Sequence, residues 1–301
     1  MRHVLSASQF RKAELLEIMQ QSVEMEKLLE EGGTDMAKGK ILATLFYEPS
    51  TRTRLSFETA MNRLGGKVIS TSDVTFSSVS KGETIEDTIR ILSGYADVVA
   101  MRSKEVGYAD RAAKMSGVPV LNAGDGPGEH PTQSLLDLYT IQKYFTLDEP
   151  LNVVFVGDMK YGRTVHSLET ILRNFDNVTI SFVAPESIQI PDSHFKAALG
   201  DQKFNELNDE IIANADVIYD TRVQEERFED RDEYMRLRDA FIFDTEKVSK
   251  MKSNAILLHP LPRVNEITPE VDDLPQAKYF EQAKNGVPVR MTLIARGLGL
   301  I

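Results

Sequence analysis

The stretch Ser50-Thr51-Arg52-Thr53-Arg54 decides the fold, because it joins a short apolar run to an amphipathic segment. The apolar run at 41–46 predicts a buried strand, and Ser50 or Thr51 predicts the N-cap of a following helix. That helix presents apolar residues on one face and ends at Gly65-Gly66. The sequence therefore predicts a strand, a tight turn and a helix, the unit from which α/β sheets are built.

The turn concentrates hydroxyl and guanidinium groups where a helix begins. The N-terminus of a helix attracts negative charge through its unpaired N–H groups, and arginine offers planar paired donors that suit phosphate oxygens. The segment therefore predicts a phosphate site built without a glycine-rich loop. The alternative interpretation is a capped helix with two solvated arginines, which is a common surface arrangement.

Composition indicates a globular chain of 301 residues, with 42% apolar and 27% charged residues. The net charge of −11 argues against a broad nucleic-acid surface but allows a local basic pocket. The chain has no cysteine, and its five histidines lack metal-binding spacing, so we expect no disulfide and no metal site. Met1–Phe10 lacks a signal-peptide core, and no run approaches the roughly 20 apolar residues of a membrane span, which predicts a cytoplasmic protein.

Apolar runs alternate with amphipathic segments in both halves of the chain, which predicts parallel sheets with helical crossovers. Asp148-Glu149-Pro150 marks the boundary between the halves. The expected fold class is α/β, with two doubly wound domains, each a mostly parallel sheet flanked by helices, and long helices bridging them. Expected strands are 41–46, 67–70, 97–101, 118–121, 151–156, 178–183, 217–219, 241–243 and 255–258, and expected long helices are 8–31, 130–145 and 289–298.

Cationic or amide side chains follow most of the predicted strands. In open α/β sheets, ligands bind beyond the carboxyl ends of the strands. An acidic chain that places Arg or Lys at these ends predicts an anion pocket, whereas the alternative is that loops are simply polar. The residues concerned are 50–54, Ser77, Lys81, Arg102, His130 and Gln133 in the first half, and Arg163, Arg222, Gln224 and 259–263 in the second.

The stretch Gly157–Thr164 nearly fits the nucleotide-binding P-loop pattern. Arg163 stands where the phosphate-binding lysine is required, and three bulky residues occupy the part of the loop that should be small. Nucleotide binding is therefore the weaker interpretation of this stretch.

Together, these stretches resemble the aspartate/ornithine carbamoyltransferase family, and within it the aspartate carbamoyltransferase catalytic chains, over essentially the whole length. The motif at 50–54 is typical of carbamoyltransferases in general. An ornithine enzyme is expected to have His-Cys-Leu-Pro where this chain has 259–262, and to lack the Lys-Gly-Glu loop at 81–83. The other matching motifs are Phe46–Pro49, Met101-Arg102, His130–Gln133, Gly162–Ser167, Thr221–Gln224 and Arg263.

The resemblance implies transfer of the carbamoyl group of carbamoyl phosphate to L-aspartate, in pyrimidine nucleotide biosynthesis and without a cofactor. It implies a carbamoyl-phosphate-binding domain at 1–149, completed by a C-terminal helix at 286–301, and an aspartate-binding domain at 150–285. It also implies a homotrimer with shared active sites and no nucleic acid or membrane partner, and it leaves regulatory chains open as a further partner.

The resemblance further implies a role for each candidate residue. The expected catalytic residues are Arg52, Thr53 and His130. The expected carbamoyl phosphate ligands are Ser50, Thr51, Arg52, Thr53, Arg102, His130, Gln133 and the backbone carbonyls of Leu261 and Pro262. The expected aspartate ligands are Lys81, Arg163, Arg222 and Gln224, with Ser77 and Lys81 supplied by a neighbouring subunit. His166, inside a predicted helix, is expected to be structural.

Three alternatives stay open at this point. The chain could be a carbamoyltransferase for another amino acid such as ornithine, a non-catalytic anion-binding protein of the same fold, or a nucleotide-hydrolysing enzyme. Each predicts a different pattern of phosphate release from carbamoyl phosphate and from nucleotides.

Overall fold

The computed structural model describes residues 3–71, 82–223 and 231–301. The chain forms two compact units, one made of Met1–Tyr139 with Asn285–Ile301 and the other of Thr140–Lys284. Each unit contains one parallel sheet flanked by helices, which confirms the predicted α/β class. Among the described residues, no helix combines the length and the apolar character that crossing a membrane requires.

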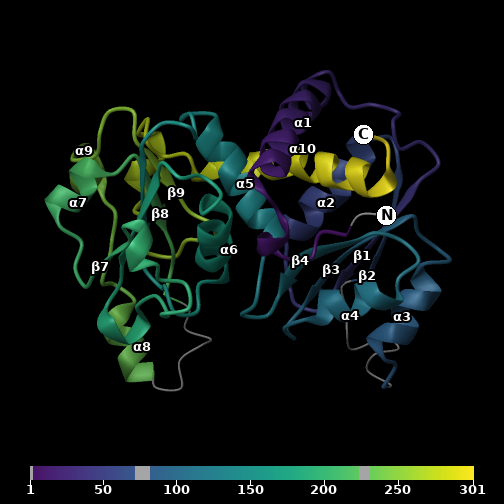
Figure 1. Ribbon diagram of the computed structural model, residues 1–301, viewed down its shortest axis with the longest axis horizontal. Coiled ribbons are helices and arrows are strands. Elements are labelled where there is room, and N and C mark those ends of the chain that lie inside the picture. The colour runs from purple at the N-terminus through teal and green to yellow at the C-terminus, as the bar shows by residue number, and fades with distance from the viewer. Residues whose placement is uncertain (1–2, 72–81, 224–230) are drawn as a thin grey trace. The chain divides into compact units, whose positions relative to one another are not determined.

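The sheet of the first unit has the order β2-β1-β3-β4, and its strand pairs are all parallel. The strands are β1 (Ile41–Phe46), β2 (Lys67–Thr71), β3 (Val98–Ser103) and β4 (Val120–Asp125). Helices α1 (Lys12–Glu30), α2 (Arg52–Arg63) and the later part of α10 (Tyr279–Leu298) lie on one side, and α3 (Ile85–Leu92) and α4 (Tyr108–Met115) on the other (Figure 1). Because both faces are covered, the inner strands are apolar and buried along almost their whole length.

The sheet of the second unit has the order β7-β6-β5-β8-β9, again with parallel pairs. Its strands are β5 (Leu151–Val156), β6 (Val178–Val183), β7 (Gln202–Phe204), β8 (Val217–Asp220) and β9 (Ile256–Leu258). Helix α6 (Arg163–Leu172) lies on one side of the sheet, and α7 (Asp209–Asn214) and α9 (Thr245–Ser249) lie on the other (Figure 1). The remaining helices are α5 (Pro131–Gln142), α8 (Arg231–Leu237) and the short η1 (Ala7–Gln9), η3 (Glu186–Ile188), η4 (Ala197–Leu199) and η6 (Pro269–Asp273).

The predicted helix ends were wrong at both termini of the chain. The segment predicted as one helix at 8–31 is broken, because Phe10 and Arg11 have extended backbone angles between η1 and α1. The last helix begins at Tyr279 rather than at 289, and Pro288 lies inside it. Proline removes one helical hydrogen bond, but the helix continues because the residues after it, including Val289 and Met291, are fully buried.

In the second unit, one strand prediction was also wrong and one strand was missed. The segment 241–243 forms a single bridge from Phe243 to Ile267 rather than a strand, because the backbone hydrogen bonds of Phe243 are made with the residues on either side of Ile267. Conversely, β7 was not predicted. It is a three-residue edge strand with a single apolar residue, and such strands carry little apolar pattern to detect.

Candidate functional site

The predicted phosphate turn lies at the carboxyl end of β1, where the chain enters α2. Thr51 is the N-cap residue, but it has helical backbone angles and its side chain does not cap the helix, contrary to the prediction. The first turn is closed by the backbone instead, since the Leu55 N–H donates to the Thr51 carbonyl at 3.0 Å. Thr53 is buried in the first turn and Ser50 is half-buried before it. The Thr51 hydroxyl is therefore not used as a helix cap.

Arg102 lies beside this turn, at the end of the neighbouring strand. Residues Phe46 and Arg102 pair across β1 and β3, and the Tyr47 N–H donates to the Arg102 carbonyl at 2.8 Å. The Arg102 side chain donates through Nε to the Glu48 carboxylate at 3.1 Å, with 12% and 21% of the two side chains exposed. Glu48 therefore holds the Arg102 guanidinium at the same end of the sheet as the phosphate turn.

His130 and Gln133 follow β4, the next strand across. His130 is 4% exposed and directly precedes Pro131, the first residue of α5. The turn before it is held by Asp125, whose carboxylate accepts from the Glu129 N–H at 2.6 Å. Since β1, β3 and β4 are adjacent and parallel, their carboxyl ends meet at one edge of the sheet. The first unit therefore brings Ser50, Thr51, Arg52, Thr53, Arg102, His130 and Gln133 to that edge.

In the second unit, the loop after β5 lies in close, hydrogen-bonded contact with the loop after β8. Gly157 has φ +109°, and a Cβ placed there would lie 2.0 Å from the Thr221 carbonyl oxygen. The Thr221 hydroxyl also accepts from the Asp158 N–H at 3.1 Å. This close approach places Arg163, the first residue of α6, and Arg222, two residues after β8, at the same edge of the second sheet.

The P-loop interpretation of Gly157–Thr164 is not supported by the backbone. A phosphate cradle needs N–H groups that point at the ligand. Here the Met159 and Lys160 N–H groups donate to the Ile188 carbonyl at 3.1 and 3.0 Å, and the Tyr161 N–H donates to the Asp158 carboxylate at 2.9 Å. These donors are used within the protein, so the loop forms no cradle.

The turn after β9 is organised by a buried histidine. His259 is 2% exposed, its Nδ1 accepts from the Leu261 N–H at 2.8 Å, and its Nε2 lies 2.8 Å from the Glu266 carboxylate. This pattern requires Nε2 to carry the proton. Burial lowers the pKa of His259, although Glu266 opposes the shift. Leu261 adopts a left-handed backbone (φ 53°), an uncommon conformation that such hydrogen bonds stabilise.

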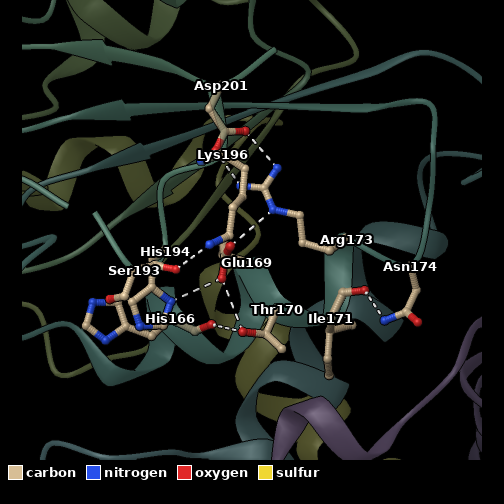
Figure 2. Close-up of polar contacts among 10 residues, drawn as sticks. All are labelled: His166, Glu169, Thr170, Ile171, Arg173, Asn174, Ser193, His194, Lys196 and Asp201. Atoms are coloured by element: carbon tan, nitrogen blue, oxygen red, sulfur yellow. Dashed lines mark hydrogen bonds and ion pairs between the residues drawn. The ribbon is translucent and has the colours of Figure 1, made fainter. Parts of the chain in front are cut away.

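Helix α6 carries a polar cluster beyond Arg163 (Figure 2). Arg173 donates to both Asp201 oxygens, at 2.7 and 2.5 Å, and through Nε to Glu169 at 3.1 Å. His166 donates through Nε2 to the Met159 carbonyl at 2.7 Å and stacks on His194 with ring centroids 4.2 Å apart. The cluster ties the segment at 193–201 to α6 and supports the structural role expected for His166.

Three of the expected site residues, Ser77, Lys81 and Gln224, lie outside the described residues. Two residues were missed by the sequence analysis. Glu266 organises the turn that carries Leu261 and Pro262, and Asp137 accepts from the Gln133 side chain at 2.8 Å. Neither has a recognisable sequence signal, because single carboxylates four or seven residues from a site residue occur throughout soluble proteins.

Comparison with protein families assigns both halves of the chain. Residues 2–143 match the family described as aspartate/ornithine carbamoyltransferase, carbamoyl-P binding domain. Residues 149–296 match its companion, the aspartate/ornithine carbamoyltransferase Asp/Orn binding domain.

Relatives named aspartate carbamoyltransferase catalytic subunit match almost end to end. One from Methanococcus maripaludis is 48% identical over 295 residues, covering 98% of this chain and 97% of the relative. One from Thermoplasma acidophilum is 49% identical over 303 residues, covering 99% and 98%.

Two solved structures show the same architecture. The catalytic subunit of M. jannaschii aspartate transcarbamoylase has a TM-score of 0.90 and 46% identity, covering 99% of this chain and 98% of that one. The Trypanosoma cruzi aspartate transcarbamoylase in complex with carbamoyl phosphate and aspartate has a TM-score of 0.91 and 36% identity, covering 97% and 95%.

Proposed function

The chain belongs to the aspartate/ornithine carbamoyltransferase family, and from that membership we propose that it transfers the carbamoyl group of carbamoyl phosphate to L-aspartate. The products are N-carbamoyl-L-aspartate and phosphate, which makes the reaction a step of pyrimidine biosynthesis. The observation that carries the proposal is near-complete coverage by relatives of 48–49% identity that are named for this activity. Relatives solved with carbamoyl phosphate and aspartate, and with carbamoyl aspartate and phosphate, support the same substrate pair.

The two compact units correspond to two substrate domains in this proposal. Residues 1–149, completed by 286–301, bind carbamoyl phosphate, and residues 150–285 bind L-aspartate. Support comes from the two family matches at 2–143 and 149–296, and from the return of Asn285–Ile301 to the first unit.

Carbamoyl phosphate is assigned to the sheet edge of the first unit. Hydroxyl and guanidinium donors at Ser50, Thr51, Arg52 and Thr53 hold the phosphate group, and Arg102 shares it. The arrangement suits a dianion, because arginine forms paired, charge-assisted hydrogen bonds with phosphate oxygens. The pairing of Arg102 with Glu48 supports this assignment, since it orients one of these donors in advance.

The reaction needs positioning and charge stabilisation rather than an activating group. The neutral aspartate amine forms a bond to the carbonyl carbon, the bond from that carbon to the phosphate oxygen breaks, and the nitrogen gives up a proton that the departing phosphate accepts. His130 and Thr53 donate to the carbonyl oxygen as it gains negative charge, and Arg52 stabilises the charge on the leaving phosphate. Gln133 and the backbone carbonyls of Leu261 and Pro262 hold the carbamoyl NH2.

L-aspartate is assigned to cationic residues of the second unit. Arg163 and Arg222 bind its carboxylates, and their position at one sheet edge supports this assignment. Lys81 and Gln224 are assigned to the same site, and only the resemblance of their sequence motifs supports this assignment. A cationic substrate such as ornithine would be repelled by this set of charges.

The assembly proposed for the chain is a homotrimer with shared active sites. Ser77 and Lys81 of one subunit serve the site of its neighbour, and regulatory chains are a further partner, a view supported by the designation of the relatives as catalytic subunits. Mixing Arg52→Ala chains with Lys81→Ala chains tests the sharing. Activity should return in mixed assemblies, and its complete absence would argue against shared sites.

One assay tests the activity itself. Phosphate release from carbamoyl phosphate should depend on L-aspartate, with one carbamoyl aspartate formed per phosphate, and L-ornithine should not replace L-aspartate. Release that requires ornithine would favour the other branch of the family. Binding of carbamoyl phosphate without aspartate-dependent release would favour a non-catalytic protein.

A further inference from the structure

Gln133 is fixed by a carboxylate that does not belong to the assigned ligands. Its Nε2 donates to Asp137 Oδ1 at 2.8 Å, one turn further along α5. An ionised carboxylate only accepts hydrogen bonds, so the amide of Gln133 must direct its NH2 toward Asp137. The carbonyl oxygen of that amide is then the atom that Gln133 can present to a ligand.

Asp137 is fully buried, and a buried carboxylate needs a compensating charge. Arg290 on α10, which is 3% exposed, is a buried cation close enough to interact electrostatically with Asp137. Burial lowers the pKa of Arg290 to about 10, and the negative charge of Asp137 acts in the opposite direction. The Arg290 guanidinium also lies over the ring of Phe57, 5.0 Å from its centroid, in the helix that begins at the phosphate turn.

A glycine makes room for this guanidinium. Gly286 lies one turn before Arg290 in α10, and a Cβ at position 286 would lie 2.3 Å from Arg290 Nη1 and 3.3 Å from Leu136 Cδ2. Alanine is favoured over glycine inside a helix, so helix stability does not explain a glycine here. The glycine is explained instead by the space that the Arg290 guanidinium occupies, which a side chain at position 286 would fill.

We propose that Asp137 and Arg290 are positioning residues that fix the Gln133 amide so that its carbonyl oxygen accepts from the carbamoyl NH2 of the substrate. The proposal rests on the function proposed above. If the Arg290 charge is removed or displaced, Asp137 loses the cation that acts on it and no longer holds the Gln133 amide in one orientation. In the reversed orientation, the NH2 group of Gln133 would face the NH2 group of carbamoyl phosphate, and neither could accept.

The test compares two ligands that differ only in the carbamoyl group. Dissociation constants of carbamoyl phosphate and of inorganic phosphate are measured by calorimetry on the full assembly of wild type, Gly286→Ala, Arg290→Met and Gln133→Ala. We expect each variant to bind carbamoyl phosphate about tenfold more weakly, the effect of one lost hydrogen bond. Phosphate binding should change less than about twofold, because phosphate does not contact Gln133. Gly286→Ala carries the test if Arg290→Met fails to fold.

Two controls separate positioning from general damage. Thr292→Val removes another buried polar group of α10, one that contacts Ser22 at 3.1 Å, and should leave both constants unchanged. In a Gln133→Ala background, Gly286→Ala should cause no further loss, because the residue it repositions is gone.

The outcomes distinguish this inference from the proposed function. Equal losses for both ligands, no loss for either, or fully additive losses in the double variant would overturn the positioning role alone. A wild-type chain that binds no carbamoyl phosphate would overturn the proposed function, and the inference with it.

Discussion

At the scale of single residues, Arg102 illustrates how the site is prepared. Its Nε is bonded to Glu48 at 3.1 Å while both side chains are mostly buried. A charge-assisted hydrogen bond of this kind restricts the guanidinium to a narrow set of orientations. An arginine that is already ordered loses less conformational entropy when an anion binds. Glu48 therefore orders Arg102, one of the proposed phosphate ligands, before any anion binds.

Arg52→Ala should lower kcat by roughly 10²–10³-fold, the usual effect of losing one preorganised donor to a developing negative charge. The melting temperature should not change, since Arg52 is exposed and lies in the first turn of α2. Steady-state rates and thermal unfolding measure the two effects. The control is Arg63→Ala in the last turn of the same helix, which should leave kcat intact. A kcat for Arg52→Ala within tenfold of wild type would contradict the role given to this residue.

The cationic candidate residues stand out in the sequence because each follows a predicted strand within a dense local pattern. Arg52 stands among hydroxyl residues, and Arg222 follows shortly after the apolar run at 217–219. Asp137 and Glu266 were not predictable. Their importance comes from burial beside Gln133 and His259, and burial of a lone carboxylate depends on tertiary packing rather than on neighbouring sequence.

At the scale of elements, α6 has two different ends. Its first residue is the proposed aspartate ligand Arg163, and its later turns hold the polar cluster around Arg173 (Figure 2). Breaking a buried charge pair leaves an uncompensated charge. The cluster should therefore control the stability of the second unit without affecting the chemistry.

Asp201→Asn should lower the free energy of unfolding by about 3 kcal/mol, because Arg173 loses a buried, paired carboxylate. Urea unfolding measures this change, and activity per folded molecule should stay at the wild-type level. Asp192→Asn is the matched control, since Asp192 pairs with Lys203 but is 99% exposed, and it should leave the unfolding midpoint unchanged. Equal effects of the two substitutions would show that burial does not determine the strength of the Arg173 pair.

The same cluster should make the protein sensitive to acid. Burial, followed by the charge of His194, lowers the pKa of His166 from 6.5 to about 4. The unfolded chain then binds this proton at a higher pH than the folded chain, so the contribution of His166 to stability is complete above pH 6.5 and is lost as the pH falls toward 4. Burial alone would raise the pKa of Glu169, but hydrogen bonds from His194 and Arg173 outweigh it and the pKa is lowered. Loss of the Glu169 contribution follows at still lower pH.

Urea unfolding at several pH values between 7 and 4 tests the assignment to His166. His166→Gln can still donate to the Met159 carbonyl but cannot titrate, so its stability should fall less steeply across the interval from pH 6.5 to 4. A slope equal to that of wild type would assign the acid sensitivity to other groups.

At the scale of the whole molecule, the α/β class followed from the alternation of apolar runs and amphipathic segments in both halves. What the sequence could not show is which segments cross between units. The last helix belongs to the first unit only from Asn285 onward, and its start at Tyr279 depends on packing that overrides Pro288. The order of strands in each sheet also depends on contacts between distant segments, which no local pattern records.

The division into two units predicts that the substrates can be impaired separately. Arg222 follows β8 in the second unit, whereas the phosphate turn follows β1 in the first. Arg222→Ala should raise the KM for L-aspartate about 30-fold or more, because truncating one partner of a charged hydrogen bond costs at least about 2 kcal/mol. The dissociation constant of carbamoyl phosphate, measured by calorimetry without aspartate, should stay within about twofold of wild type. An unchanged aspartate dependence would remove Arg222 from the second site, and a parallel loss of carbamoyl phosphate binding would show that the two units do not bind their ligands independently.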